Sequence, residues 1–437
     1  MDVIEQVHPV IDEKSLLPYV EDFHKNAASY LSICRQNGSP LYLFDEYALL
    51  KRAQQFTSAF KKYFSDFRAY FAVKSNNHPL IAKTLVGFGM GLDVSSGLEL
   101  SLGLSCGSRD ILFSGPGKTE RELYLAVKHN TAVTVLMDSF GELERLEKSA
   151  RKKKCLVPGG VRICTDENGL WRKFGIPLSS LESFMEVAEK CPHVDVIGLQ
   201  FHTSWNHNPD RQTQFIKKIG QTLRLLSKKR LSMIKFIDIG GGYWPERGEW
   251  LQPAGTPAGQ LLQSLGPENF HSTEHYKIDA SSIETFASQL AGAMKDHIFP
   301  LIISCGVKAE PGRWLCDDAM HILLTVVDKK ADDLVITDGG INLVGWERFE
   351  TDYAPVINIT RPSLTERECL ILGSLCTPRD IWGHSYFGDC IEPGDVLLIP
   401  AQGAYTYSLR QRFIKPLAKI VKFYGINTVK NNGSSPN

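Results

Sequence analysis

The chain has 437 residues, more than one hydrophobic core usually supports, so we expect two domains. Lysine plus arginine and aspartate plus glutamate each number 49, and this zero formal charge does not favour nucleic acid or an anionic membrane as a partner. No apolar run reaches the roughly 18 residues that span a bilayer, and the opening residues lack the basic and apolar regions of a signal peptide. We therefore expect a soluble cytoplasmic protein with a small-molecule ligand. The ten cysteines show neither a disulfide framework nor a metal-binding spacing.

Apolar residues alternate between strand and helix patterns over the first 300 or so positions. A first amphipathic helix is predicted at 46–64, and strict βα alternation follows, which indicates a parallel sheet. Eight such units in about 250 residues match a closed (β/α)8 barrel better than an open sheet. The long segment 244–280, rich in Gly, Pro and Gln, is predicted to be a βα loop on the active-site face. The predicted strands are 67–73, 92–94, 111–113, 132–136, 161–164, 196–201, 234–239 and 301–303, with helices near 79–88, 97–104, 119–130, 139–150, 179–190, 210–229 and 281–297.

Past residue 316 the pattern changes to short β-type runs broken by Gly, Pro and Asp. We predict a barrel domain at 46–316 and a mostly antiparallel β-domain formed by 1–45 and 317–437. The run LYLF (41–44) is a candidate strand that the amino end contributes to this second domain, and residues 429–437 are predicted to fray.

Polar residues follow nearly every predicted barrel strand, and in a (β/α)8 barrel the chemistry lies on these loops. The first is Lys74, which ends the apolar run YFAVKSN (70–76). Most lysines in such places are solvated strand ends; the alternative is an amine at the barrel mouth that forms a Schiff base. The other polar residues after strands are Asp93, Ser96, Ser114 to Gly117, Asp138, His202, Gly240 to Gly242, Glu310 and Arg313.

Several of these motifs carry two interpretations each. The three glycines of IDIGGGY (237–243) either cradle a phosphate or form an ordinary turn. Glu310 and Arg313 in AEPGRW are either an acid for a ring nitrogen and a phosphate ligand, or a surface ion pair. His202 is either a stacking ring or a core histidine, and Cys376 is either reactive or structural. A Schiff-base lysine, a phosphate cradle, an acid and a flat ring together indicate a pyridoxal phosphate site.

These motifs resemble the fold-type III pyridoxal phosphate decarboxylases, which include the diaminopimelate, ornithine and arginine decarboxylases. The resemblance implies a (β/α)8 barrel followed by a β-domain, pyridoxal 5'-phosphate as cofactor, and a homodimer whose active sites are shared between subunits. It covers nearly the whole chain, through YFAVKSN (70–76), GLDVSSGLEL (91–100), SGPGKTERELYLAV (114–127), MDSFGEL (137–143), WRKFGI (171–176), GLQFHTS (198–204), DIGGGY (238–243), EPGR (310–313), LCTPRD (375–380) and GAYT (403–406).

By this resemblance, Lys74 carries the cofactor, His202 stacks on its ring and Glu310 pairs with the ring nitrogen. The catalytic residues are Lys74, His202 and Cys376, the last on a loop that the partner subunit delivers. Either Cys376 or Lys74 returns a proton to the α-carbon. The remaining cofactor-binding residues are Asp93 near the lysine, Gly241, Gly242, Arg313 and Tyr405 at the phosphate, and Gly312.

The candidate substrate residues depart from the family pattern. In members that act on diamino acids, an acidic residue follows the loop cysteine and helps bind the distal ammonium. This chain has Thr377 there, with Arg379 two positions on and Asp380 next to it. A neutral residue beside a cation suits a distal carboxylate or carbonyl better than an ammonium.

Two further departures concern the barrel and the β-domain. Ser204 and Trp205 stand where the family usually has Gly-Ser, which removes a phosphate-contacting serine and adds bulk. Trp346 lies about where diaminopimelate decarboxylases have a substrate arginine, and Arg348 follows two positions later.

We therefore predict a homodimeric pyridoxal phosphate decarboxylase that removes the α-carboxylate of an amino acid with an acylated or acidic distal group. A citryl-diamino acid of siderophore biosynthesis is such a substrate. Three alternatives stay open: a diaminopimelate or ornithine decarboxylase, an amino-acid racemase, and a non-catalytic regulatory homologue. Glu310 argues against the racemase, because racemases of this fold typically have an arginine at the ring nitrogen. The combination of Lys74, Glu310 and Cys376 argues against the regulatory homologue.

Overall fold

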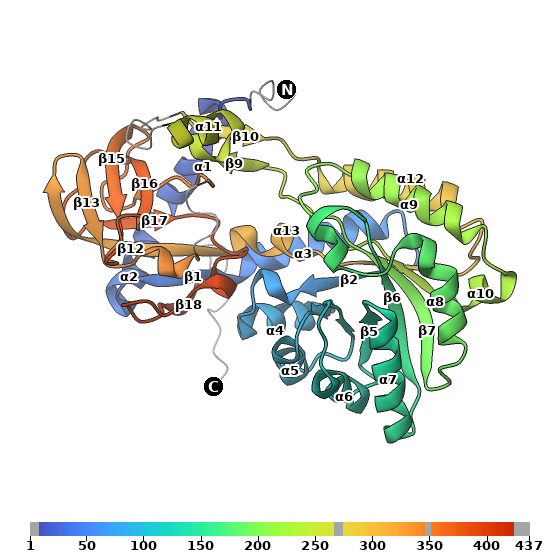
Figure 1. Cartoon of the computed structure of the whole chain (residues 1–437). Coiled ribbons are helices and arrows are strands. Elements are labelled where there is room, and N and C mark those ends of the chain that lie inside the picture. Colours follow the sequence, from blue (N-terminus) through green and yellow to red (C-terminus); the bar gives the residue numbers. More distant parts are fainter. Residues whose placement is uncertain (1–7, 266–273, 346–350, 424–437) are drawn as a thin grey trace, which may run out of the picture. The chain divides into compact units, whose positions relative to one another are not determined.

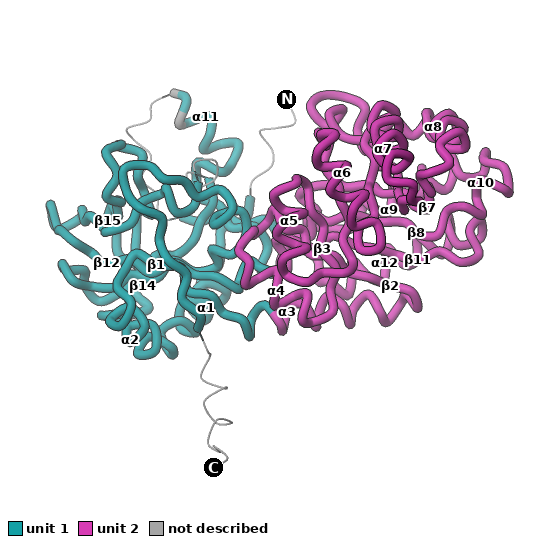
Figure 2. The backbone as a smooth tube through the Cα atoms, turned by 90° about the horizontal axis from the view of Figure 1, so that it is seen from below, with its two compact units in different colours: residues 1–49, 247–279, 316–437 teal, residues 50–246, 280–315 magenta. Residues whose placement is uncertain are grey.

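The computed structural model describes residues 8–265, 274–345 and 351–423, which form two compact units (Figure 2). Unit 1 contains Met1–Leu49, Arg247–Asp279 and Cys316–Asn437, and unit 2 contains Leu50–Glu246 and Ala280–Leu315. The predicted boundaries at 46 and 316 stay a prediction. Trp346, Arg348 and the tail 429–437 lie outside the described residues.

Unit 2 is built around a closed barrel of parallel strands, so the predicted (β/α)8 barrel is confirmed. The chain closes the ring by pairing its last barrel strand with both the first and the seventh. The order around the barrel is β2 (Phe67–Ala72), β3 (Gly91–Val94), β4 (Ile111–Phe113), β5 (Val133–Met137), β6 (Val157–Ile163), β7 (Val194–Phe201), β8 (Phe236–Asp238) and β11 (Gly306–Ala309).

Helices connect the strands and lie outside them, as Figure 1 shows for α7 (Phe140–Lys153) and α8 (Leu181–Ala188) beside β5 to β7. Several begin on a hydroxyl side chain that caps the first turn. Ser96, Ser139 and Ser282 each accept a backbone N–H hydrogen bond, and Thr119 forms a capping box with Glu122. The helices are α3 (Glu46–Lys61), α4 (Pro79–Phe88), α5 (Gly97–Ser105), α6 (Glu120–Lys128), α7 (Phe140–Lys153), α8 (Leu181–Ala188), α9 (Asp210–Leu223), α10 (Lys228–Met233), α12 (Ile283–His297) and α13 (Arg313–Cys316).

The predicted eighth strand at 301–303 is wrong. Helix α12 (Ile283–His297) ends before this run, which lies in the turn that follows: Ile302 is buried there, whereas Ile303 is fully exposed. The real strand, β11, is GVKA, in which glycine and lysine hide the strand pattern. Its pairing with β8 and β2 makes it a strand in spite of its weak intrinsic preference.

Unit 1 contains an eight-stranded sheet, and its mostly antiparallel character is confirmed. The LYLF run forms β1 (Leu41–Asp45), which pairs antiparallel with β12 (Met320–Ala331) and parallel with β18 (Lys419–Phe423). Two strands of this sheet, β16 (Ile381–Phe387) and β18 (Lys419–Phe423), were not predicted, because Gly, His and Ser in the first and lysines in the second interrupt the apolar run. The others are β12 (Met320–Ala331), β13 (Leu334–Thr337), β14 (Ile357–Asn358), β15 (Glu366–Leu372), β16 (Ile381–Phe387), β17 (Val396–Ile399) and β18 (Lys419–Phe423), preceded by helices α1 (Glu13–Lys25) and α2 (Ala27–Asn37).

The excursion at 247–279 groups with unit 1 rather than with the barrel. It carries β9 (Glu249–Leu251), α11 (Pro257–Leu265) and β10 (Tyr276–Ile278), so it is more structured than the predicted loop. Arg247 anchors its start, donating hydrogen bonds to the Tyr19 hydroxyl at 2.8 Å and to Asp317 Oδ2 at 2.9 Å. Within the described ranges, no helix is long and apolar enough to cross a membrane.

Candidate active site

The pairing of the barrel strands shows which side chains point into the barrel. Directly paired residues share a face of the sheet, and side chains two positions apart lie on the same face. Gln200 pairs with Asp238, and Asp238 pairs with Lys308, whose ammonium lies 3.8 Å from the centre of the Phe236 ring. This contact with core residue Phe236 identifies the inner face. The side chains at and just beyond the carboxyl ends of the strands on this face are Asp93, Ser114, Asp138, Arg162, Gln200, His202, Asp238 and Glu310.

Lys74 lies in a 3-10 turn, Val73–Ser75, directly after β2. Its amine donates a hydrogen bond to Asp93 Oδ2 at 3.2 Å, and Ser114 Oγ donates to Asp93 Oδ1 at 2.6 Å. The Asp93 side chain is fully buried, whereas 37% of the Lys74 side chain stays exposed. The carboxylate is therefore held from one side and orients an amine that a ligand can reach.

His202 follows β7 and presents a neutral ring. The Gly241 N–H donates to His202 Nδ1 at 3.1 Å, so this nitrogen carries the lone pair and Nε2 carries the proton. Burial lowers the pKa of His202 well below its ordinary value, and the charges of Lys74 and Arg162 act in the same direction. Glu310 Oε2 lies 3.7 Å from Nδ1, but an unprotonated nitrogen forms no ion pair with it.

Glu310 follows β11 and is 2% exposed. Its backbone N–H donates to the Gly240 carbonyl at 2.9 Å, and Gln200 Nε2 donates to Glu310 Oε1 at 3.2 Å. Burial raises the pKa of Glu310 well above its ordinary value, reinforced by the charges of Asp238 and Asp93. Within the described ranges, no lysine or arginine lies at ion-pair distance from it. The site therefore favours a ligand group that shares a proton with this carboxyl.

The three glycines after β8 have different roles. The Gly240 N–H donates to Asp238 Oδ1 at 2.9 Å, and the Gly241 N–H is used by His202. The part of the chain that the structure describes offers no acceptor to the Gly242 N–H, which stays available for an anion. The predicted phosphate contact of Gly241 cannot come from its own N–H without loss of the His202 bond.

Gly241→Ala should weaken cofactor binding by about tenfold or more, because a Cβ at this position would lie 2.2 Å from the Glu310 carbonyl oxygen. The shift would move both Glu310 and the bond to His202. Titration of cofactor-free protein with pyridoxal phosphate, followed by protein fluorescence, measures the change. Gly292→Ala is the matched control, because nothing lies within 4 Å of its Cβ position in α12. Equal affinity in both variants would contradict the prediction.

The loop after β11 brings Gly312 and Arg313 beside the first strand. A Cβ on Gly312 would lie 3.0 Å from the Ser75 side chain, so only glycine leaves this approach undisturbed. The Arg313 guanidinium lies 4.3 Å from the centre of the Trp244 ring, which holds it by a cation–π contact. Both residues therefore belong to the carboxyl-end face of the barrel.

Among the inward-facing polar side chains at the carboxyl ends of the strands, the sequence did not predict Arg162, Gln200 and Asp238. Arg162 lies 4.5 Å from the Phe174 ring and 3.9 Å from Asp138 Oδ1. Each of the three interrupts an apolar strand two positions away from another inward-facing residue. This period of two along β6, β7 and β8 is the signal that would have found them.

The remaining candidates lie in unit 1. Cys376 is a free, exposed thiol, and Arg379 is exposed beside half-buried Thr377. Asp380 differs from its prediction as a substrate ligand: it is 2% exposed, and its two oxygens accept the Ile341 N–H at 2.7 Å and the Leu375 N–H at 2.6 Å. Asp380 therefore positions the loop, which leaves Thr377 and Arg379 as the candidate substrate contacts.

Tyr405, the other predicted cofactor residue of unit 1, has a positive φ of 59°. Such a left-handed conformation is uncommon outside glycine and often marks a functional site. It follows Gly403, whose Cβ position is blocked by the Cys316 carbonyl. The turn is thus tightly constrained.

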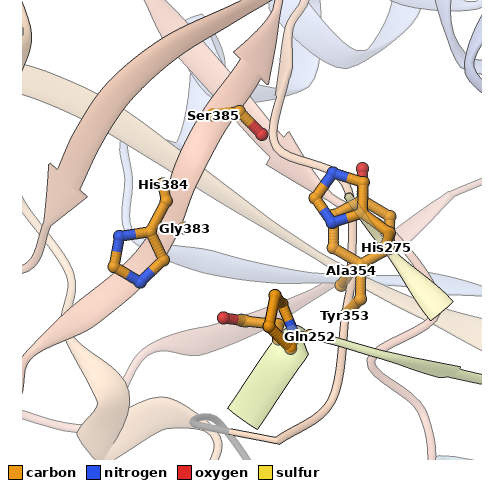
Figure 3. Close-up of a pocket in the computed structure, with 8 residues that line it drawn as sticks. Gln252, His275, Tyr353, Ala354, Gly383, His384 and Ser385 are labelled. Carbon is orange, nitrogen blue, oxygen red and sulfur yellow. The ribbon is translucent and has the colours of Figure 1, made fainter. Parts of the chain in front are cut away.

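A small pocket in unit 1 gathers polar side chains (Figure 3). The His275 and Tyr353 rings stack at 3.5 Å, His275 Nε2 lies 2.8 Å from Glu366 Oε1, and Ser385 Oγ donates to the same oxygen. The space measures about 20 Å³, enough for a water molecule but not for an amino acid. His275 Nδ1 and the Tyr353 hydroxyl are buried and have no hydrogen-bond partner among the described residues, so they suit such a water.

A larger hollow of about 520 Å³ lies at the amino ends of the barrel strands, lined by residues that include Lys61, Asp66, Arg68 and Met90. Arg68 there already pairs with Asp110 at 3.2 Å. This end of a barrel is opposite the one at which Lys74, His202 and Glu310 gather, so the hollow does not belong to the candidate site.

Comparison with known families agrees with this geometry. Residues 49–317 match the pyridoxal binding domain of the pyridoxal-dependent decarboxylases. The chain belongs to this family.

Curated relatives of this pyridoxal-dependent decarboxylase extend over nearly its full length. The L-glutamyl-(BtrI acyl-carrier protein) decarboxylase of Niallia circulans is 25% identical over 93% of this chain and 92% of its own. The diaminopimelate decarboxylase of Aquifex aeolicus is 24% identical over 94% and 92%. The 2-((L-alanin-3-ylcarbamoyl)methyl)-2-hydroxybutanedioate decarboxylase of Staphylococcus aureus is 23% identical over 84% and 89%.

Solved structures share the fold. The diaminopimelate decarboxylase of Helicobacter pylori superposes with a TM-score of 0.71 at 20% identity, over 90% of this chain and 94% of that one. The lysine/ornithine decarboxylase of Vibrio vulnificus gives 0.72 at 20% identity, over 91% and 98%. The predicted fold class, the decarboxylase activity and the cofactor are therefore confirmed at the level of the family.

The residues of the barrel fit pyridoxal phosphate. The cofactor needs an accessible amine, a donor for its phosphate and a partner for its ring nitrogen. Lys74 offers the amine, and the Gly242 N–H offers a donor. Glu310 is a buried acid with no cationic partner at ion-pair distance among the described residues. The Lys74 amine, the Gly242 N–H and the Glu310 carboxyl thus match the three groups that the cofactor needs.

Proposed function

We propose that this decarboxylase acts on an amino acid whose distal group is acylated or acidic, such as a citryl-diamino acid of siderophore biosynthesis. The observation that carries the proposal is the loop at 376–380, which exposes Arg379 and the Cys376 thiol beside a neutral Thr377. A guanidinium recognises a carboxylate bidentately and repels a bare ammonium.

Two of the curated relatives support this substrate class by name. In the S. aureus enzyme's substrate an alanine side chain carries an acyl group, and in the N. circulans enzyme's substrate glutamate is joined to a carrier protein. Neither name describes a free diamino acid. Diaminopimelate or ornithine is the second candidate, since diaminopimelate decarboxylases are equally long relatives.

Lys74 would hold the cofactor covalently, with Asp93 orienting its amine. His202 would lie against the ring as a neutral, flat surface, and Glu310 would pair with the ring nitrogen. Gly242, Arg313 and Tyr405 would bind the phosphate, with Gly241 and Gly312 leaving the room that this requires. When bound, pyridoxal phosphate accepts the electron pair left by the departing carboxylate.

Cys376 would hold the proton that returns to the α-carbon. Its thiol is exposed in unit 1, so we propose that the loop acts on the site of a second subunit in a homodimer. Mixing inactive Lys74→Ala and Cys376→Ala proteins tests this, because one site of the mixed dimer would be intact. Recovery of part of the activity is expected; a strictly monomeric protein in sedimentation would contradict it.

The cytoplasmic location stays a prediction.

Arg379→Ala should raise KM for an N-citryl diamino acid by about 10- to 100-fold with little change in kcat, because a charge-assisted contact contributes roughly 1.5–3 kcal/mol. Release of CO2 from a panel of free and acylated diamino acids measures both constants. Arg367→Ala, in the same unit, is the control, since its guanidinium faces the exposed Asp389 at 3.6 Å. Rapid turnover of free diaminopimelate or ornithine by the unaltered enzyme would overturn the substrate proposal.

A further inference from the structure

Two buried carboxyl groups lie next to each other on the inner face of the barrel. Asp238 ends β8 and is fully buried, and Glu310 follows β11 at 2% exposure. Asp238 pairs in register with Lys308, and Glu310 lies two positions beyond Lys308 on the same face. Gly240 links the two: its N–H donates to Asp238 Oδ1 at 2.9 Å and its carbonyl accepts the Glu310 N–H at 2.9 Å.

This pair has fewer donors than two carboxylates need. Asp238 Oδ2 is buried and receives no hydrogen bond from the described residues. The Glu310 oxygens share one donor, Gln200 Nε2, at 3.2 and 3.5 Å. Two adjacent buried carboxylates with so few donors are strongly disfavoured, whereas one proton between them gives Asp238 Oδ2 a donor and removes one of the two charges.

The cations of the barrel interior are engaged elsewhere. Lys74 contacts Asp93 at 3.2 Å, and Arg162 lies 3.9 Å from Asp138. The Lys308 ammonium lies over the Phe236 and Tyr70 rings, 3.8 and 5.1 Å from their centres. His202 adds no charge, because its Nδ1 accepts the Gly241 N–H. The other acid that faces the pair is Asp93, whose charge works against a second carboxylate.

We propose that Asp238 is a positioning residue that keeps one proton on Glu310, which donates its carboxyl O–H to Asp238 Oδ2 in the cofactor-free protein. Glu310 then enters cofactor binding as an acid and already carries the proton that it shares with the ring nitrogen. The role of this proton in cofactor binding rests on the assignment of the cofactor site. The shared proton of the cofactor-free protein does not depend on that assignment.

The titration of the two groups agrees with this division. Burial raises the pKa of Asp238 to about 6 and the pKa of Glu310 well above its ordinary value. Asp238 Oδ1 accepts a backbone N–H at 2.9 Å, whereas the Glu310 oxygens accept longer bonds from Gln200, at 3.2 and 3.5 Å, so Asp238 is the charged member and Glu310 the protonated one. Lys74 and Arg162 lower the pKa of Glu310, and Lys308 lowers that of Asp238, but burial outweighs these charges for both groups.

The first test measures the affinity of cofactor-free protein for pyridoxal phosphate across neutral and alkaline pH by fluorescence titration. In Asp238→Asn, which keeps an acceptor for the Gly240 N–H, the alkaline midpoint at which affinity falls should move down by about one pH unit or more. Gln200→Leu removes a donor that stabilises the Glu310 anion, so the midpoint should move up. Asp395→Asn, a buried aspartate of unit 1, is the control and should leave it in place.

An unchanged or raised midpoint in Asp238→Asn would overturn the proposal. A second measurement serves if that variant does not fold, and it needs no cofactor. The infrared spectrum of the unaltered cofactor-free protein near neutral pH should show the C=O stretch of a protonated carboxyl that Glu310→Gln removes. Absence of this band would overturn the shared proton, whereas failure to bind pyridoxal phosphate with the band present would overturn the cofactor site alone.

Discussion

Lys74→Ala should lower CO2 release by about 10²- to 10⁴-fold, because the amine that would carry the cofactor and move protons is removed. The amine is the accessible member of its pair with Asp93: 37% of the lysine side chain is exposed and none of the aspartate side chain. The visible absorbance of bound cofactor should also disappear after gel filtration.

Lys83→Ala provides the matched control, since Lys83 is an exposed lysine of the neighbouring helix α4. It should keep both the absorbance and the activity. Should Lys74→Ala retain bound cofactor with unchanged kcat, Lys74 would not be the Schiff-base residue.

Glu310→Gln should lower kcat/KM by about 10²- to 10⁴-fold while the cofactor stays attached. An amide has the size of the carboxyl but cannot share a proton with the ring nitrogen as an acid does. Cofactor absorbance and decarboxylation kinetics, measured on one preparation, separate binding from chemistry. Loss of bound cofactor together with activity would instead assign Glu310 to binding alone.

The same variant has a second expected effect, on the pH dependence of stability. The pKa of Glu310 is raised in the folded protein, so its contribution to stability is present at low pH and is lost as pH rises through the raised pKa. Urea unfolding of the cofactor-free protein should therefore show Glu310→Gln more stable than the unaltered chain at alkaline pH. Glu368→Gln, an exposed substitution in β15, is the control. Its free energy of unfolding should equal that of the unaltered protein at alkaline pH.

Much of the fold followed from apolar periodicity, and the failures have physical causes. Seven barrel strands were found because each is a short apolar run between turn residues. The eighth strand was not predicted because β11 contains Gly306 and Lys308, which interrupt the apolar pattern. The barrel interior tolerates Lys308 because its ammonium lies over the Phe236 ring. Neighbouring strands on both sides stabilise β11, and a single-sequence pattern does not contain that information.

The candidate site also contains residues that the sequence predicted and residues that it did not. Lys74, His202 and Glu310 were predicted because they close strands, where polarity changes abruptly. Asp238 lies inside the predicted apolar run 234–239, and its pairing register with Gln200 shows that it faces inward. The bonding role of Asp380 was not predictable either, because its partner Ile341 is distant in sequence.

The Asp380 bonds have a consequence for how this enzyme family can diversify. The carboxylate ties Leu375 to Ile341, and glycines at 340 and 373 leave it room, since a Cβ at either would lie within 2.6 Å of its oxygens. The stem of the loop is thus held by buried contacts, whereas Thr377 at its tip is half-buried and Arg379 is exposed. Substitutions at the tip can therefore change the substrate specificity at small cost in stability. The fold does not need to change with the substrate.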